Sequence, residues 1–303
     1  MKKENFFVRK FTQFAKKTPS EKITFCLFFI FYVLMALIFL CPIVSIFFNS
    51  FRRLQEFEIM AVDPNASPFT FPHWQFKSWA EVFTKFRYKN FTYLDMLFNS
   101  LWITGLKVFV NVAASTMLAY AVARFRFPGR NFLYALVIFA QTIPIIGTGA
   151  AGYKLFTALH FINNPKLMWI AWFSAFDFAF IVLYGTFRGI SSSYSESAKL
   201  DGANNLVILL KIVIPQAFPC ICALAIQQSI GVWNDYTISL IYLRNYPTIA
   251  YGLFVLKQGL SYSRNGNALQ AAVICISMVP IIALYACSQK LMLTNLNAGG
   301  LKG

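Results

Sequence analysis

The chain has 303 residues, of which 58% are hydrophobic, 18% are aromatic and only 13% are charged. A soluble domain carries about a quarter charged residues, so a water-soluble fold would leave too many apolar side chains without cover. The formal net charge is +16, but the basic residues are spread over loops. We interpret the excess of Lys and Arg as residues that set the orientation of the chain in the membrane and attract anionic lipid, rather than as a nucleic-acid-binding surface. Lipid is the expected solvent for most of the chain.

Six segments are long and apolar enough to cross a bilayer, which takes about 20 residues per helix. They cover residues 24–48, 101–123, 132–152, 167–187, 214–241 and 268–292. The first is too long for the apolar core of a signal peptide, and no small-residue cleavage site follows it. We therefore expect an all-α integral membrane protein with six transmembrane helices, in which residues 1–23 are a tail and residues 24–303 are the transmembrane domain.

The Lys and Arg residues beside these segments predict the orientation. They are dense in the tail 1–23 and in the link 124–130 between spans two and three. Alternating spans place these two segments on one side, which the positive-inside rule makes cytoplasmic. Arg52 and Arg53 run against the rule, but they open a long loop (about 52–100) with diluted charge. We predict a protein of the bacterial cytoplasmic membrane with both termini in the cytoplasm and the 52–100 loop outside.

Within the external loop, Ser78 and Glu81 have the spacing of a capping box, which predicts a short helix. We interpret it as an interfacial helix with an aromatic anchor, and a partner-docking surface is the alternative. The side chains expected toward the membrane surface are those of Trp79, Val82, Phe83 and Phe86.

The third span contains Pro144, Gly147 and Gly149, which should kink or break its helix. Freed backbone groups are tolerated at that depth only against protein or a water-filled cavity. Pro144 is therefore a candidate for the lining of a translocation path, with close helix packing as the alternative.

Few ionisable residues fall inside the spans, and such residues point to function because they are costly there. Asp177 lies near the middle of span four and Lys107 about two turns into span two. The two could pair, although we favour a Lys107 that extends to the outer surface. Asp177 is too short to do so and should face the helix bundle. Gln227 and Gln228 in span five could likewise contact solute or a neighbouring helix.

The segment 191–213 between spans four and five reads as two short helices that form a compact knob. Ser193 and Glu196 have capping-box spacing, and Asp201-Gly202 then ends the first helix because glycine allows a left-handed turn. Residues 203–214 would form the second helix. Its apolar stripe would consist of Leu206, Leu209, Leu210 and Val213. On physical grounds, Glu196 is more readily a cap than a docking residue.

This knob resembles the signature loop of importer-type ABC permeases, in which Glu-Ala-Ala precedes Asp-Gly-Ala and, further on, Ile-x-Leu-Pro. Here Ser197 replaces the first alanine and Ile214 replaces the leucine, with the spacing unchanged. The resemblance implies a coupling helix that seats in a cleft of an ATPase subunit. The residues it places at that joint are Glu196, Ser197, Ala198, Asp201, Gly202 and Ala203.

Further motifs extend the resemblance over about residues 25–303. Residues 119–130 look like the family's link after span two, and Asn99-Ser100 fits the start of that span. Trp233-Asn234-Asp235 resembles the motif at the outer end of span five, and we add Asn234 to the candidates for the translocation path. Residues 298–303 are similar to the C-terminus of maltose-type sugar permeases. This similarity implies that Gly300, Lys302 and Gly303 lie at the ATPase.

The resemblance implies one permease subunit of an ATP-driven, binding-protein-dependent importer of a sugar or oligosaccharide, working by alternating access. Its expected partners are a second, homologous permease subunit, two ATP-binding subunits and an extracytoplasmic solute-binding protein. No Gly-x-x-x-x-Gly-Lys-Ser/Thr run occurs, so ATP hydrolysis must belong to another polypeptide. The six cysteines lie in apolar stretches without histidine in ligand spacing, so we expect no metal site, cofactor or catalytic residue.

The alternative function is a secondary, ion-coupled transporter. Such a protein would be expected to have several intramembrane carboxylates and an internal repeat between its halves. Asp177 alone would be a poor relay, and no such repeat is evident in the sequence.

Overall fold

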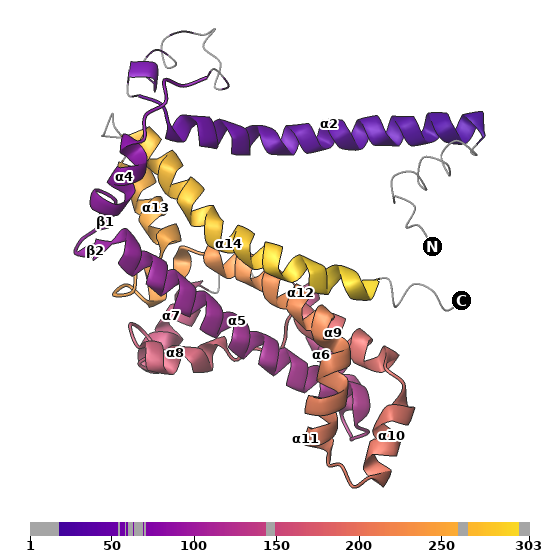
Figure 1. Cartoon of the computed structure of the whole chain (residues 1–303). Helices are drawn as coiled ribbons and strands as arrows, with labels where there is room; N and C mark the ends of the chain where they lie inside the picture. The colour runs from indigo at the N-terminus through magenta and orange to yellow at the C-terminus, as the bar shows by residue number, and fades with distance from the viewer. Residues whose placement is uncertain are drawn as a thin grey trace.

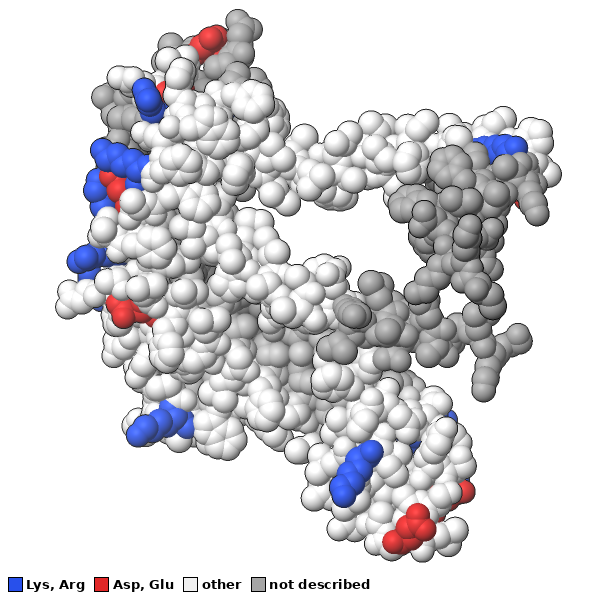
Figure 2. All heavy atoms as spheres, viewed as in Figure 1, with Lys and Arg blue, Asp and Glu red and all other residues white. Residues whose placement is uncertain are grey.

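The computed structural model of the chain describes residues 18–296, apart from residues 54, 58, 60–62, 64–68, 70, 144–148 and 260–265. Within these residues, four helical stretches are long and apolar enough to cross a membrane: Pro19–Ser50, Tyr93–Arg124, Asn205–Trp233 and Ala268–Gln289. They correspond to the expected spans one, two, five and six. Figure 2 shows charged side chains toward the ends of the molecule and a broad uncharged band between them, as a bilayer requires.

The first span, α2 (Pro19–Ser50), begins earlier than its expected start at residue 24. Thr18 and Glu21 form a reciprocal capping box and Pro19 occupies the first turn, so the helix starts where these residues satisfy its free amides. None of its most apolar window is buried within the chain. Figure 1 shows α2 extending away from the helical body, and contacts with α14 (Gly266–Leu296) hold it at one end.

The expected spans three and four are each divided between two shorter helices. Span three is represented by α6 (Arg130–Thr142) and α7 (Gly149–Ala158). Helix α6 is followed by Ile143 in an extended conformation, because a residue that precedes proline is disfavoured in a helix. The expectation that residues 167–187 form one continuous helix is wrong: α8 (Pro165–Trp172) and α9 (Phe178–Gly189) lie on either side of a non-helical segment.

Helix α5 (Tyr93–Arg124) is the axis of the body (Figure 1). It contributes buried residues to all three apolar clusters, with Met96 in the first, Ile103 in the second and Val122 in the third. It contacts α9 and α12 (Ile214–Trp233) along its length. The side chains of α5 are therefore the ones that can link several spans at once.

The segment between α2 and α5 packs as a small cap on one end of α5. It contains α4 (Lys77–Thr84) and a two-stranded antiparallel ribbon, β1 (Arg87–Tyr88) and β2 (Phe91–Thr92). The expected Ser78–Glu81 capping box is absent, because Phe76 occupies the N-cap and Glu81 instead pairs with Lys85 at 2.6 Å.

The inner face of α4 is turned toward protein rather than toward the membrane surface. Val82 and Phe86 are 0% and 3% exposed, and they pack with Tyr93 and Met96 of α5, whereas Phe83 stays exposed. The expected interfacial placement is thus wrong for Val82 and Phe86, because the start of α5 offers them a packed apolar surface.

Helix α13 (Ile249–Gly259) completes this cap after the π-helical turn η2 (Ile238–Tyr242). The Tyr251 and Tyr88 hydroxyls hydrogen-bond at 3.1 Å between α13 and β1. Burial, together with this hydrogen bond, raises the pKa of Tyr251 to about 12. Tyr251 therefore stays neutral over the physiological pH range.

Gly252 allows α13 to approach α5 closely, and this contact can be tested. A Cβ at residue 252 would lie 2.7 Å from Met96 Sδ and 2.8 Å from Phe86 Cζ, both in buried side chains. We expect Gly252→Val to lower stability by about 1–3 kcal/mol through overpacking, measured as a fall in the melting temperature of the purified protein. Gly185→Val is the control, because a Cβ there would meet nothing within 4 Å. Equal melting temperatures for the two variants would contradict the close packing.

Candidate functional site

The segment after α9 forms the expected knob, which projects beyond the spans at the lower end of Figure 1. It consists of α10 (Ser192–Leu200), α11 (Asn205–Ile208) and the π-helical turn η1 (Leu209–Val213). Helix α11, η1 and α12 follow one another without interruption, so the second arm of the knob is the end of a transmembrane helix.

The turn between α10 and α11 is a Schellman motif centred on Gly202. Gly202 has φ +81°, the left-handed conformation that glycine adopts without strain. The Ala203 amide donates to the Ala198 carbonyl at 2.9 Å and the Gly202 amide donates to the Lys199 carbonyl at 3.0 Å, the two bonds that define this motif. The expected positive φ is confirmed, but no other backbone presses on Gly202, since a Cβ there would meet nothing within 4 Å.

The caps of the two arms differ from those expected. Ser191, rather than Ser193, caps α10, and Asn204 caps α11 by accepting a 2.8 Å hydrogen bond from the Val207 amide. The Ser193–Glu196 capping box is therefore wrong. The Glu196 side chain is exposed and makes no hydrogen bond or ion pair with the described residues. Its carboxylate is thus free of a local structural role there.

The apolar residues of the second arm divide between two faces. Leu209 and Val213 are buried in the cluster around α5 and α9, as the expected stripe requires. Leu206 and Leu210 point outward and are 61% and 55% exposed, and Leu200 at the end of α10 is 90% exposed. The knob thus presents large apolar side chains next to free charged ones, an arrangement typical of a binding surface.

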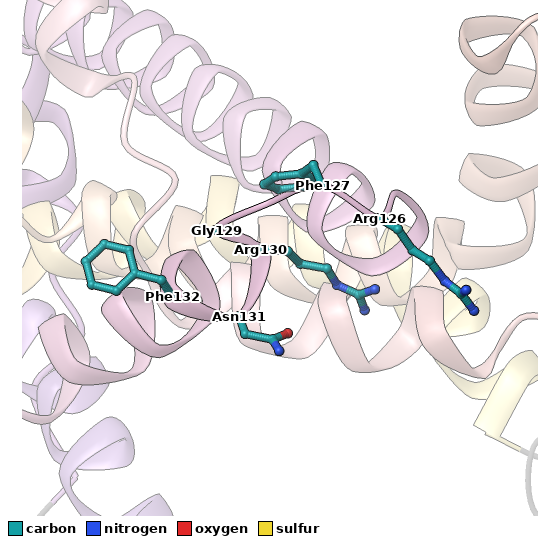
Figure 3. A pocket seen from close by; sticks show the side chains of 6 residues that line it. All are labelled: Arg126, Phe127, Gly129, Arg130, Asn131 and Phe132. Carbon is teal, nitrogen blue, oxygen red and sulfur yellow. The ribbon is translucent and has the colours of Figure 1, made fainter.

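A shallow pocket of about 390 Å³ lies at the turn from α5 into α6 (Figure 3). Its lining residues are Arg126, Phe127, Gly129, Arg130, Asn131 and Phe132. Gly129 has φ +87° and turns the chain from the end of α5 into α6. Next to it, Arg124 donates a 2.7 Å hydrogen bond to the Ile190 carbonyl, which ties this basic link to the base of the knob.

A polar junction within the spans surrounds Asp177. One of its carboxylate oxygens accepts hydrogen bonds from the Ser115 hydroxyl at 2.8 Å and from the Phe180 amide at 3.0 Å, so Asp177 caps α9. The Gln228 amide donates to the other oxygen at 3.3 Å and to Asn111 Oδ1 at 2.7 Å. The junction thus connects α5, α9 and α12.

Two further side-chain amides donate hydrogen bonds to backbone carbonyls in the break between α8 and α9. Asn111 Nδ2 donates to the Ser174 carbonyl at 2.9 Å, and Gln141 Nε2 donates to the Phe176 carbonyl at 2.6 Å. Sequence reasoning missed both Asn111 and Gln141. A signal was available for Asn111, because it lies four residues from both Lys107 and Ser115 and so continues one polar face of α5.

Lys107 pairs with Asp235 of the Trp-Asn-Asp motif, with an N–O distance of 3.8 Å, and both side chains are 29% exposed. The suggested pairing of Lys107 with Asp177 is wrong, because Asp177 lies two turns further along α5, next to Ser115. The Lys107 side chain thus extends toward one end of α12, in line with the expectation that it extends along its helix. Its ammonium group there pairs with the Asp235 carboxylate.

The other candidates are not part of the junction. The Gln227 side chain is exposed and makes no hydrogen bond with the described residues, and the Asn234 side chain donates only to the Ile230 carbonyl of α12 at 2.8 Å. Four candidates lie outside the described residues: Pro144, Gly300, Lys302 and Gly303. Among the described residues, no group of three or more His, Cys, Asp and Glu side chains could hold a metal ion.

Comparisons with known proteins agree with this architecture. Residues 112–295 match the family called binding-protein-dependent transport system inner membrane component. The diacetylchitobiose uptake system permease protein NgcG from Streptomyces coelicolor is 25% identical over 88% of this chain and 85% of its own. The maltose/maltodextrin transport system permease protein MalG from Vibrio parahaemolyticus is 29% identical over 70% of this chain and 74% of its own.

A solved structure shares the fold. A chain of a bacterial ABC transporter involved in the import of the acidic polysaccharide alginate superposes with a TM-score of 0.73 at 23% identity, over 90% of this chain and 98% of that chain. The fold and site define a multi-pass helical permease with a projecting loop before its fifth span. Since the family match spans more than half of the chain, the protein belongs to the inner membrane components of binding-protein-dependent ABC transport systems.

The Lys107–Asp235 pair yields a charge-exchange prediction. Lys107→Asp places two carboxylates together where the middle of α5 meets the end of α12, and like charges there should lower the melting temperature and the yield of folded protein. The double variant Lys107→Asp with Asp235→Lys restores opposite charges and should recover most of the loss. A double variant no more stable than Lys107→Asp would contradict the ion pair.

Proposed function

We propose that the chain imports a sugar or oligosaccharide as one of two permease subunits, driven by separate ATP-binding subunits and supplied by an extracytoplasmic solute-binding protein. The observation that carries this proposal is the knob, a capped and partly apolar surface at the end of a transmembrane helix. The carbohydrate substrate is supported by the diacetylchitobiose and maltose systems to which relatives belong.

The knob is the proposed contact with the ATPase. Its Schellman turn sets α10 at an angle to α11, and Ala198 and Ala203 are small where the two arms meet. Glu196 and Asp201 supply exposed carboxylates, whereas the exposed Leu200 supplies apolar area. Ser197 is exposed on the same arm and belongs to this surface. By resemblance, we place the C-terminal residues Gly300, Lys302 and Gly303 against the same partner.

The exposure of helix α2 is an argument for a second permease subunit. Its most apolar window is 0% buried, whereas half of the corresponding window of α5 is buried inside the chain. A helix that few other spans of its own chain cover is suited to pack on a partner in the membrane. We propose a homologous permease as that partner, with lipid covering the remaining surface.

Polar side chains on the spans support a hydrophilic translocation path. We propose that Pro144, Asp177, Gln227, Gln228 and Asn234 line or border it. Gln227 and Asn234 are exposed on α12 or at its end, although polar groups at membrane depth are costly. Amide side chains both donate and accept hydrogen bonds, so they suit the hydroxyl groups of a sugar. The alternative of an ion-coupled transporter is weakened, since the Asp177 carboxylate already accepts three hydrogen bonds within the protein.

The glycine of the knob provides the central test. Gly202→Asp forces a side chain into the left-handed region, which costs about 1 kcal/mol or more, and adds a charge at the joint. We expect near-normal abundance in the membrane, loss of sugar uptake and weaker co-purification of the ATPase. Glu196→Ala should act more mildly, because Glu196 caps no helix and contributes only a screened charge.

Gly202→Asn is the matched control, because asparagine meets a similar backbone cost in the left-handed conformation but adds no charge. It should retain more uptake and more ATPase than Gly202→Asp. Normal transport together with normal ATPase recovery in Gly202→Asp would exclude the knob as the coupling element and would overturn the proposed function.

Orientation forms a separate prediction. We propose that both termini are cytoplasmic and that the segment around His73, which is exposed, lies outside. In a background without the six native cysteines, His73→Cys should react with a membrane-impermeant thiol reagent in intact cells. The exposed Ser193→Cys of the knob should react only after the cells are broken. The reverse pattern would contradict the orientation.

A further inference from the structure

Helix α12 directly joins the knob to the interior of the spans. Residues from Asn205 to Trp233 form one uninterrupted helical run. The π-helical turn η1 lies within this run, where the Ile214 amide donates to the Leu209 carbonyl, and the run therefore passes Pro215 without ending. Because no non-helical residue separates α11 from α12, a displacement of the knob carries α12 with it.

Gln228 carries side-chain hydrogen bonds from α12 to two neighbouring parts of the spans. Its amide donates to Asn111 of α5 at 2.7 Å and to Asp177 at the start of α9 at 3.3 Å. Lipid tails offer no replacement for a lost hydrogen bond. A movement of α12 must therefore either move these two partners or leave their polar groups unsatisfied.

Both partners of Gln228 form hydrogen bonds at the break between α8 and α9. Asp177 is its last residue and caps α9. Asn111 uses its oxygen to accept from Gln228 and its nitrogen to donate to the Ser174 carbonyl, inside the break. A segment without its own helical hydrogen bonds is the part of the spans that can change its backbone angles most readily. The break is thus suited to act as a hinge, and Gln228 contacts two of the residues that hold it, Asn111 and Asp177, while Gln141 holds it from α6.

We propose that Gln228, Asn111 and Asp177 form a coupling junction that transmits displacement of the knob, through α12, to the hinge between α8 and α9. The proposal rests on the proposed function, and it assigns these three residues a positioning role in transport. The junction makes the two halves of the divided fourth span respond to the ATPase. Without it, α12 moves while the hinge keeps its position.

The test uses the complete transporter, with both permease subunits and the ATPase, reconstituted in lipid vesicles with the solute-binding protein loaded with its sugar. Gln228→Leu removes both hydrogen bonds at similar volume. We expect normal assembly and continued ATP hydrolysis, but sugar uptake per ATP hydrolysed lowered about fivefold or more, the factor that corresponds to one lost intramembrane hydrogen bond. Asn111→Leu should give a similar fall, and the double variant should be no worse than either single variant, because both disable one junction.

Ser229→Ala is the matched control. Ser229 is the next residue of α12 and is buried, whereas Gln228 is partly buried, and the Ser229 hydroxyl donates only to the Ala225 carbonyl of the same helix. Its uptake per ATP should equal that of the unchanged protein. Should Gln228→Leu not assemble, Gln228→Met and Asn111→Leu carry the same measurement.

An unchanged ratio of uptake to hydrolysis in these variants overturns the junction, whether both rates are normal or both fall together. Additive effects of Gln228→Leu and Asn111→Leu also overturn it. Failure of the proposed function is distinguishable, because then the unchanged chain would not assemble with the ATPase or would transport no sugar.

Discussion

Every backbone amide and carbonyl within the hydrocarbon layer needs a hydrogen-bond partner, and the rest of this structure depends on that requirement. Four stretches meet it as continuous helices. Between α8 and α9 the helix is interrupted, and side chains of other spans replace the missing partners. Asn111 and Gln141 donate to carbonyls of the break, and Asp177 accepts the free amide of Phe180. The divided span is therefore stable only while these neighbours stay in place.

The same requirement explains why polar residues concentrate on one face of α5. Lys107, Asn111 and Ser115 are four residues apart, and each contacts a different polar group, on Asp235, Gln228 and Asp177 respectively. This face makes α5 both the centre of the apolar packing and the support of the polar contacts. Because α11 and η1 of the knob continue directly into α12, the helix joined to the proposed ATPase contact is also the one that contacts this face. The α5–α12 interface therefore contains both the polar contacts of the spans and the helix that continues into the knob.

A small set of local hydrogen bonds holds the knob, the proposed docking surface, in shape. Two backbone bonds and a positive φ at Gly202 define the turn, and Ser191 and Asn204 cap the two arms. With the backbone satisfied by these residues, Glu196 and Leu200 have no structural duty among the described residues and remain exposed. The surface is thus available to a partner without a preceding rearrangement.

The sequence by itself determined the membrane environment, the knob and the left-handed glycine, because apolar length and turn chemistry are local properties. Of the six spans that it predicted, four are continuous helices. It also provided the family resemblance. Only the tertiary structure decided that the fourth span is divided, since its composition is apolar apart from a few residues such as Ser174 and Asp177 and the break depends on amides from α5 and α6. The partners of Lys107 and Asp177 were likewise decided there, because side chains more than 60 residues apart in sequence meet only through helix packing.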